Sequence, residues 1–226
     1  MRTERDKMQL YAAAGVLAAF MTMVGDYLLE YTAGLSSTPL GPMGFVESAW
    51  ADMAAWRFTA SLWLGAFAMP LLLLGFWGLK LLLDQYDSKW AKRVWAASAA
   101  GVAGGGFIHI VLCLMPIAWK TALPGGETQA TAIVEAMGRA LLAPFGVFYA
   151  VLVFLPTILL TIATFKGRTP FRRWQMLLNP VVFIVAAVAF MQLGDGFQWL
   201  AVGSASRGLM ALFLLTMMWA RKKMSS

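Results

Sequence analysis

Six stretches of this sequence each run for at least 18 residues with no more than two charged side chains. They cover about residues 9–31, 57–80, 94–118, 141–165, 177–194 and 200–220. A helix that crosses a bilayer needs about 20 mostly apolar residues, so each stretch is a candidate span. The fifth is the shortest and opens with Asn179-Pro180, but the apolar run from Val181 to Phe190 still favours a span. We therefore predict an all-α integral membrane protein of six transmembrane helices, arranged as three consecutive hairpins.

The composition agrees with lipid as the solvent of this chain. Hydrophobic residues make up 60% of it and charged residues 13%, whereas a soluble domain carries about 25% charged residues. So few polar residues cannot cover a surface exposed to water. We expect residues 1–226 to form a single membrane domain.

Basic residues are concentrated on one side of the six predicted spans. With the N-terminus placed in the cytoplasm, 14 of the 18 Lys and Arg residues fall on the cytoplasmic side. Cytoplasmic loops of membrane proteins carry such an excess of Lys and Arg. The pattern predicts that both termini are cytoplasmic and that the protein is a multi-pass membrane protein. It also explains the net charge of +7 without nucleic acid as a partner.

The acidic residues divide the other way, since seven of the eleven lie in or beyond the outer half. The outer connections of the first two hairpins each contain a segment that we expect to form a short amphipathic helix, at about Phe45–Ala55 and Glu127–Ala140. The acids within and near these segments are interpreted as solvated rim residues. They are Glu47, Asp52, Glu127 and Glu135, and Glu30 at the outer end of the first span is open to the same interpretation.

The sequence indicates an internal repeat. A shift of 86 residues, without a gap, superimposes residues 7–80 on 93–166 and aligns Pro70 with Pro156. Residues 173–223 fit the same pattern more loosely. The prediction is a tandem array of hairpins that share one orientation.

Ionisable residues inside a membrane are costly and mark candidate functional sites. At about 1.5 Å of rise per residue, several polar side chains fall at similar depths in the outer third of the bilayer. This predicted polar layer contains Asp26, Glu30, His109, Gln192, Asp195 and Arg207, with Arg57 near the outer rim. Asp26 and Glu30 are four residues apart and share one helix face.

We assign candidate catalytic roles to three members of this layer. His109 would act as general base or acid, since a single imidazole beside carboxylates can be poised near neutral pH. Asp26 would orient it, and Arg207 would hold an anionic group or developing negative charge. The candidate ligand-binding residues are Glu30, Gln192, Asp195 and Arg57. A relay of Ser206, His109 and Asp26 is compatible with their depths.

A structural interpretation of the same residues stays open. Asp26 or Asp195 would then pair with Arg207 to brace helices, and His109 would be a packing residue beside Gly104-Gly105-Gly106. With one histidine, the chain offers no His cluster for zinc or haem. We predict neither a metal nor a cofactor.

The first span contains Gly25-Asp26-Tyr27-Leu28-Leu29-Glu30-Tyr31. This stretch, with the region of His109, resembles an uncharacterised family of small bacterial polytopic membrane proteins. The resemblance implies a bacterial inner membrane and no particular reaction.

Three functional hypotheses follow. The favoured one is a polar pocket, open to the outer leaflet or periplasm, that binds a small or lipid-like molecule and acts on it by acid–base chemistry. The second is a small-solute or proton-coupled transporter, although few polar residues lie inward of His109. The third is a non-enzymatic membrane subunit. The sequence does not indicate an oligomeric state.

Overall fold

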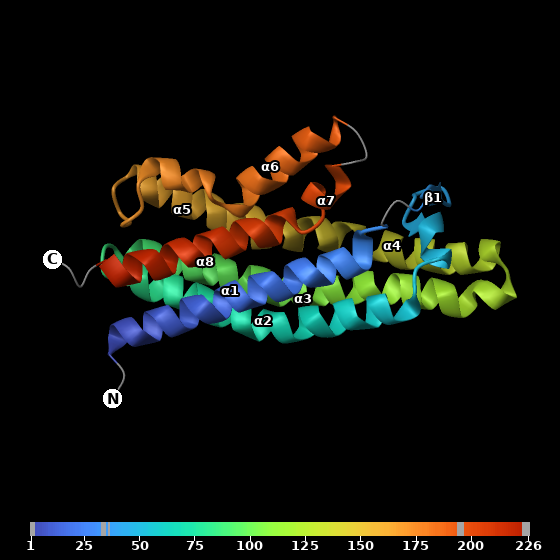
Figure 1. Cartoon of the computed structure of the whole chain (residues 1–226), viewed down its shortest axis with the longest axis horizontal. Helices are drawn as coiled ribbons and strands as arrows, with labels where there is room; N and C mark the ends of the chain where they lie inside the picture. Colours follow the sequence, from blue (N-terminus) through green and yellow to red (C-terminus); the bar gives the residue numbers. More distant parts are fainter. Residues whose placement is uncertain (1–2, 33–34, 36, 194–196, 223–226) are drawn as a thin grey trace.

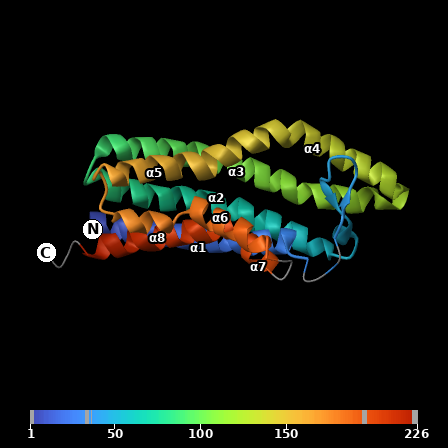
Figure 2. The ribbon, with the colours of Figure 1, turned by 90° about the horizontal axis from the view of Figure 1, so that it is seen from above.

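The computed structural model describes residues 3–32, 35, 37–193 and 197–222. Figure 1 shows an elongated bundle in which α1 begins and α8 ends at the same end of the molecule. The helices are α1 (Glu4–Glu30), α2 (Ala55–Asp84), α3 (Ser88–Ala122), α4 (Glu127–Tyr149), α5 (Leu155–Phe165), α6 (Pro180–Met191), α7 (Gln198–Ala201) and α8 (Ser204–Lys222). Seen from above, α3, α4 and α5 lie along one side, α1 and α8 along the other, and α2 between them (Figure 2).

Polar side chains define where the long helices begin. Thr3 and Asp6 form a capping box at the start of α1, and Asp87 accepts hydrogen bonds from the backbone N–H groups of Lys89 and Trp90 at the start of α3. These caps satisfy N–H groups that have no partner within the helix. They fix both helix starts at the end of the bundle where α8 finishes.

Four helical segments are long and apolar enough to cross a membrane, among the residues that the structure describes. They are Glu4–Glu30, Ala55–Asp84, Ser88–Gly125 and Glu127–Phe165, and they contain the first four predicted spans. The chain therefore has the helices of a membrane protein. The last two predicted spans are not confirmed: α6 has 12 residues and reaches only about 18 Å, against a hydrocarbon core of about 30 Å.

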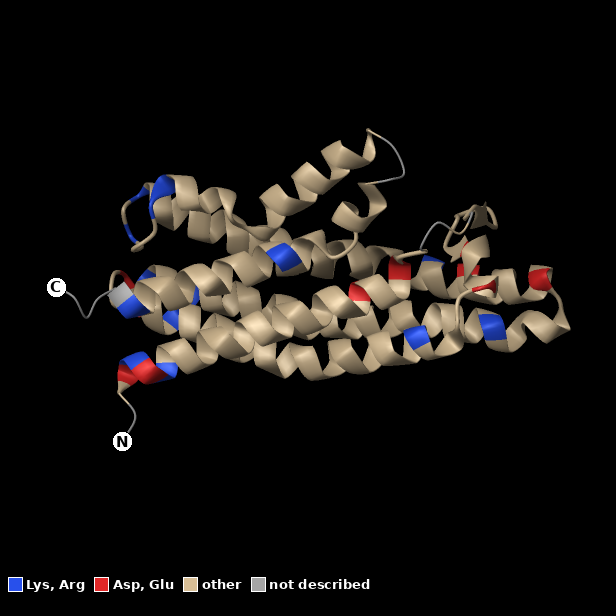
Figure 3. Cartoon of the chain, viewed as in Figure 1, with Lys and Arg blue, Asp and Glu red and all other residues tan. Residues whose placement is uncertain are grey.

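Charged residues separate along the bundle. Figure 3 shows Lys and Arg gathered at the end where α1 begins and α8 finishes, and most acidic residues in the opposite half. This arrangement agrees with the segregation expected from the sequence.

The connection between α1 and α2 contains a small β-hairpin that the sequence did not predict. Strands β1 (Pro39–Leu40) and β2 (Val46–Glu47) pair antiparallel, with Pro39 opposite Glu47. Within the expected amphipathic segment 45–55, Ser48–Ala51 forms a 3₁₀ turn, and α2 begins at the last residue, Ala55. The hairpin lies beside α4 at the acidic end of the molecule (Figure 1).

The second expected amphipathic helix does not exist as a separate element. Glu127–Ala140 is the first part of α4, which continues through a π-helical turn (Ala150–Phe154) into α5. The expectation failed because the apolar run after Ala140 extends the same helix, which continues even through Pro144.

Glu135 is a further correction, because it is not a solvated rim residue. It is only 2% exposed, and its carboxylate accepts hydrogen bonds from the backbone N–H groups of Met43 (3.1 Å) and Phe45 (3.2 Å). A buried carboxylate needs such donors. Glu135 therefore attaches the turn of the β-hairpin to α4.

Helices α1 and α2 pack most closely where two glycines meet. A Cβ atom placed on Gly15 would lie 2.7 Å from the Cα atom of Gly75 and 2.8 Å from the ring of Phe213. Small residues of this kind let helix backbones approach in a membrane. The Phe213 ring, from α8, packs edge-on against Phe76 with centroids 5.2 Å apart.

The outer connections of the first two hairpins differ. One is the β-hairpin with its 3₁₀ turn, and the other is a tight 3₁₀ turn, Leu123–Gly125, between α3 and α4. The internal repeat of residues 7–80 and 93–166 stays a prediction.

Candidate functional site

A cavity of about 230 Å³ lies in the acidic half of the bundle, and we call it the chamber. Its walls come from α1, α2, α3, α4, the π-helical turn and the segment from α7 to α8. Seven of its 20 lining residues are polar, and the others are apolar or glycine. The polar ones are Thr22, Asp26, Glu30, His109, Tyr149, Ser204 and Ser206.

The His109 ring is positioned by α2. Its Nε2 atom lies 3.1 Å from the carbonyl oxygen of Ser61 and 3.5 Å from both Ser61 Oγ and Cys113 Sγ. A carbonyl oxygen only accepts hydrogen bonds, so Nε2 carries a hydrogen and the neutral ring keeps its lone pair on Nδ1. No hydrogen bond joins Nδ1 to any residue in the described part of the chain. This nitrogen is therefore free to accept a proton or a hydrogen bond.

Gly65 makes room for that ring. It lies one helical turn after Ser61, and a Cβ atom there would collide with the imidazole carbons and Nε2 of His109. Sequence reasoning missed Ser61, Gly65 and Tyr149 as site residues. The available signal was the spacing of Ser61 and Gly65 by four residues in an otherwise apolar helix, which places a hydroxyl and a gap on one face.

Asp26 is held by α8. Ser206 donates a hydrogen bond of 3.0 Å from Oγ to the Asp26 carboxylate. The sequence placed Asp26, Ser206 and His109 at one depth, and all three line the chamber. Asp26 and Ser206 pair with each other, whereas Ser61 rather than Asp26 sets the orientation of His109.

Glu30 lies one turn after Asp26 and also lines the chamber. Neither carboxylate forms an ion pair with any basic residue in the described ranges. Two like charges one helical turn apart repel each other. The site therefore has a local excess of negative charge whenever both acids are ionised.

Arg207 does not join them in the chamber. Its guanidinium donates to the backbone carbonyls of Leu200 (2.6 Å) and Trp199 (2.7 Å) and to the hydroxyl of Tyr27. The four-residue helix α7 leaves those carbonyls without partners, and Arg207 in the first turn of α8 satisfies them. The structure thus brings Asp26 and His109 to one cavity and directs Arg207 to the junction of α7 and α8.

Arg57, at the start of α2, also binds backbone carbonyls. Its guanidinium donates to the carbonyls of Tyr27 and Leu28, each at 3.1 Å, and of Tyr31. A cation at a helix C-terminus is electrostatically favourable, so Arg57 caps α1.

Of the last two predicted binding residues, the structure describes Gln192, which does not line the chamber. Gln192 is exposed at the end of α6. Asp195 lies outside the described residues.

A second cavity, of about 310 Å³, adjoins the chamber on the side of the β-hairpin, and we call it the vestibule. The two cavities share Leu29, Glu30 and Leu112 as lining residues. The vestibule is also lined by Glu47 and Trp50. Glu30 therefore stands at the boundary between the two cavities.

Comparison with known proteins gives one match. None of the curated proteins or solved structures matches the chain. A family model described as a family of unknown function, DUF6796, matches residues 1–223. The chain therefore belongs to the DUF6796 family.

Proposed function

We propose that the protein crosses a bacterial inner membrane six times, with both termini in the cytoplasm, and that its chamber binds a small or lipid-like molecule. In this topology the fifth crossing is broken. The turn Arg173–Leu177 and α6 share it, and Asn179 caps α6 by accepting a hydrogen bond from the N–H of Val182. The chamber then lies in the outer half of the bilayer.

The observation that carries this proposal is that the chamber is lined partly by polar and partly by apolar side chains. The carboxylate of Asp26 and the ring of His109 supply polar groups, while Phe145, Leu152 and Leu209 supply apolar walls. Binding sites for small molecules are mostly apolar with a few convergent polar groups. An amphipathic molecule would place its polar group near Asp26 and His109 and its apolar part against the other walls.

Acid–base chemistry on the bound molecule is the second part of the proposal. His109 would accept a proton at Nδ1, because Nε2 already donates its hydrogen to the carbonyl oxygen of Ser61. Ser206 would keep the Asp26 carboxylate in place to stabilise the resulting imidazolium. Ser61 is fully buried and would act as a positioning residue. Arg207 is not assigned a role, since its donors are already bound to α7 and Tyr27.

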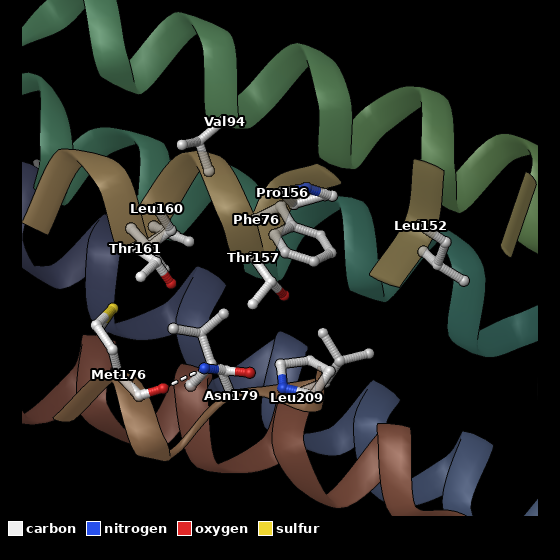
Figure 4. Close-up of a pocket in the computed structure, with 13 residues that line it drawn as sticks. Phe76, Val94, Leu152, Pro156, Thr157, Leu160, Thr161, Met176, Asn179 and Leu209 are labelled. Carbon is white, nitrogen blue, oxygen red and sulfur yellow. Dashed lines mark hydrogen bonds between the residues drawn. The ribbon is translucent and has the colours of Figure 1, made fainter. Parts of the chain in front are cut away.

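One observation favours the transporter alternative. Leu152 and Leu209 line the chamber and also line a smaller void further along the bundle (Figure 4). This void is bordered by Thr157, Thr161 and Asn179, with Asn179 donating to the carbonyl of Met176. Its volume of about 10 Å³ has room for about one water molecule. Transport would therefore require Leu152 and Leu209 to separate.

The test is to identify what the purified protein retains. The protein is extracted in a neutral detergent, and bound molecules are released and compared by mass spectrometry between wild type and Leu209→Trp, which fills the chamber. The matched control is Leu214→Trp on the same helix, because Leu214 is 45% exposed and Leu209 only 7%. We expect a molecule that is retained by wild type and the control and lost from Leu209→Trp. Equal retention by all three proteins would refute the proposal.

A further inference from the structure

The basic residues that the structure describes in the acidic half line neither cavity. Arg57 and Arg207 are bound to backbone carbonyls, as described above. Lys120 donates from Nζ to the carbonyls of Trp50 and Ala51, each at 2.8 Å. Arg139 is exposed on α4 and lines neither cavity. Basic groups are thus present in this half, but they bind backbone carbonyls or lie on the exposed surface.

The acids, in contrast, line the route inward. Glu47 and Glu30 line the vestibule, and Glu30 and Asp26 line the chamber. Asp26 is half-buried and Glu30 is exposed where α1 ends. A carboxylate placed in the outer half of a membrane is costly unless an opposite charge or hydrogen-bond donors compensate it. Ser206 supplies one donor to Asp26, and no described residue forms an ion pair with Glu30. A positively charged ligand would supply the compensating charge for these carboxylates.

Aromatic rings border the same space. Phe145 and Tyr149 stack with centroids 5.7 Å apart in the chamber wall, and Trp50 lies in the vestibule wall. The faces of such rings attract organic cations. The free lone pair on Nδ1 of His109 could additionally accept a hydrogen bond from an ammonium N–H.

We propose that the ligand of the chamber is an alkylammonium compound that enters through the vestibule. Its ammonium group lies between Asp26 and Glu30, and its alkyl chain lies against the apolar walls. An organic cation fits better than a metal ion, because within the described ranges no three His, Cys, Asp or Glu side chains are grouped to hold a metal. This inference rests on the proposed function, since it names the class of molecule that the same chamber would bind.

The experiment compares three probes that differ only in their polar group: hexylammonium, hexan-1-ol and hexanoate. Each is titrated into the full-length protein in a neutral maltoside detergent, with binding followed by calorimetry. We expect hexylammonium to bind at least tenfold more tightly than hexan-1-ol, and hexanoate to bind more weakly than either. Asp26→Asn and Glu30→Gln should each weaken hexylammonium binding at least tenfold. Asp52→Asn should leave it unchanged, since Asp52 is exposed and lines neither cavity.

The outcomes separate the two proposals. Equal binding of the three probes, or a preference for hexanoate, would overturn the inference of a cationic ligand and leave the chamber as a binding site. If none of the probes bound, the proposed function would fail together with the inference. The comparison of probes on the wild-type protein decides the charge of the ligand even where a variant does not fold.

Discussion

Gly65→Ala tests directly whether His109 is positioned by the face of α2. The added methyl group would collide with the imidazole ring. Overpacking of this kind costs about 1–3 kcal/mol, while replacing a helical glycine by alanine gains about 0.5–1 kcal/mol. The net loss in the free energy of unfolding should be between about 0 and 2.5 kcal/mol. For a chain of this size the upper end corresponds to a fall in melting temperature of roughly 5–10 °C.

Two other helical glycines provide matched controls. A Cβ atom on Gly25 would meet Ser61 at 3.5 Å, which is ordinary contact, and one on Gly146 would meet nothing within 4 Å. Gly25→Ala and Gly146→Ala should therefore keep or slightly raise the melting temperature, measured by intrinsic fluorescence in detergent. Gly65→Ala should also abolish ligand binding in the chamber.

The decisive variant combines Gly65→Ala with His109→Ala. Removing the imidazole removes the collision, so the alanine at position 65 should no longer destabilise the protein in this background. If Gly65→Ala alone were as stable as Gly25→Ala, or if His109→Ala failed to rescue it, the ring would not lie over Gly65.

Three further predictions concern topology, electrostatics and the β-hairpin. A cysteine at Gly125 should react with an impermeant thiol reagent added outside intact cells, and one at Ser88 should not; labelling at Ser88 would contradict the proposed six-span topology. The double variant Asp26→Asn with Arg207→Gln should melt no higher than either single variant, because the hydrogen bonds of the two side chains go to separate partners, and rescue of one change by the other would instead reveal an ion pair. Glu135→Ala should cost about 1–3 kcal/mol, because it leaves two partly buried N–H groups without their acceptor, and should speed proteolysis of the β-hairpin; unchanged proteolysis would show that other contacts hold the turn.

The amino-acid sequence alone determined the class of this protein. The apolar runs that became α1, α2, α3 and the helix from α4 to α5 are visible without any structure, because the hydropathy of a span sums over consecutive residues. The separation of basic and acidic residues along the bundle was also predictable, because the order of the spans assigns each charged residue to one side of the membrane. The shared depth of Asp26, His109 and Ser206 also followed from the sequence, since each residue of a helix advances by a fixed rise.

What the tertiary structure decided is which of these residues face one another. Depth along a helix does not give the rotation of one helix against its neighbour, so the sequence could not show that the ring of His109 rests on Ser61 and Gly65. Nor could it reveal that α8 begins at Ser204, after a helix α7 too short to satisfy its own carbonyls. Those free carbonyls bind Arg207. A single break in backbone hydrogen bonding thereby directs the Arg207 guanidinium to the junction of α7 and α8, and Asp26 and Glu30 are the acidic residues that line the chamber in the described part of the chain.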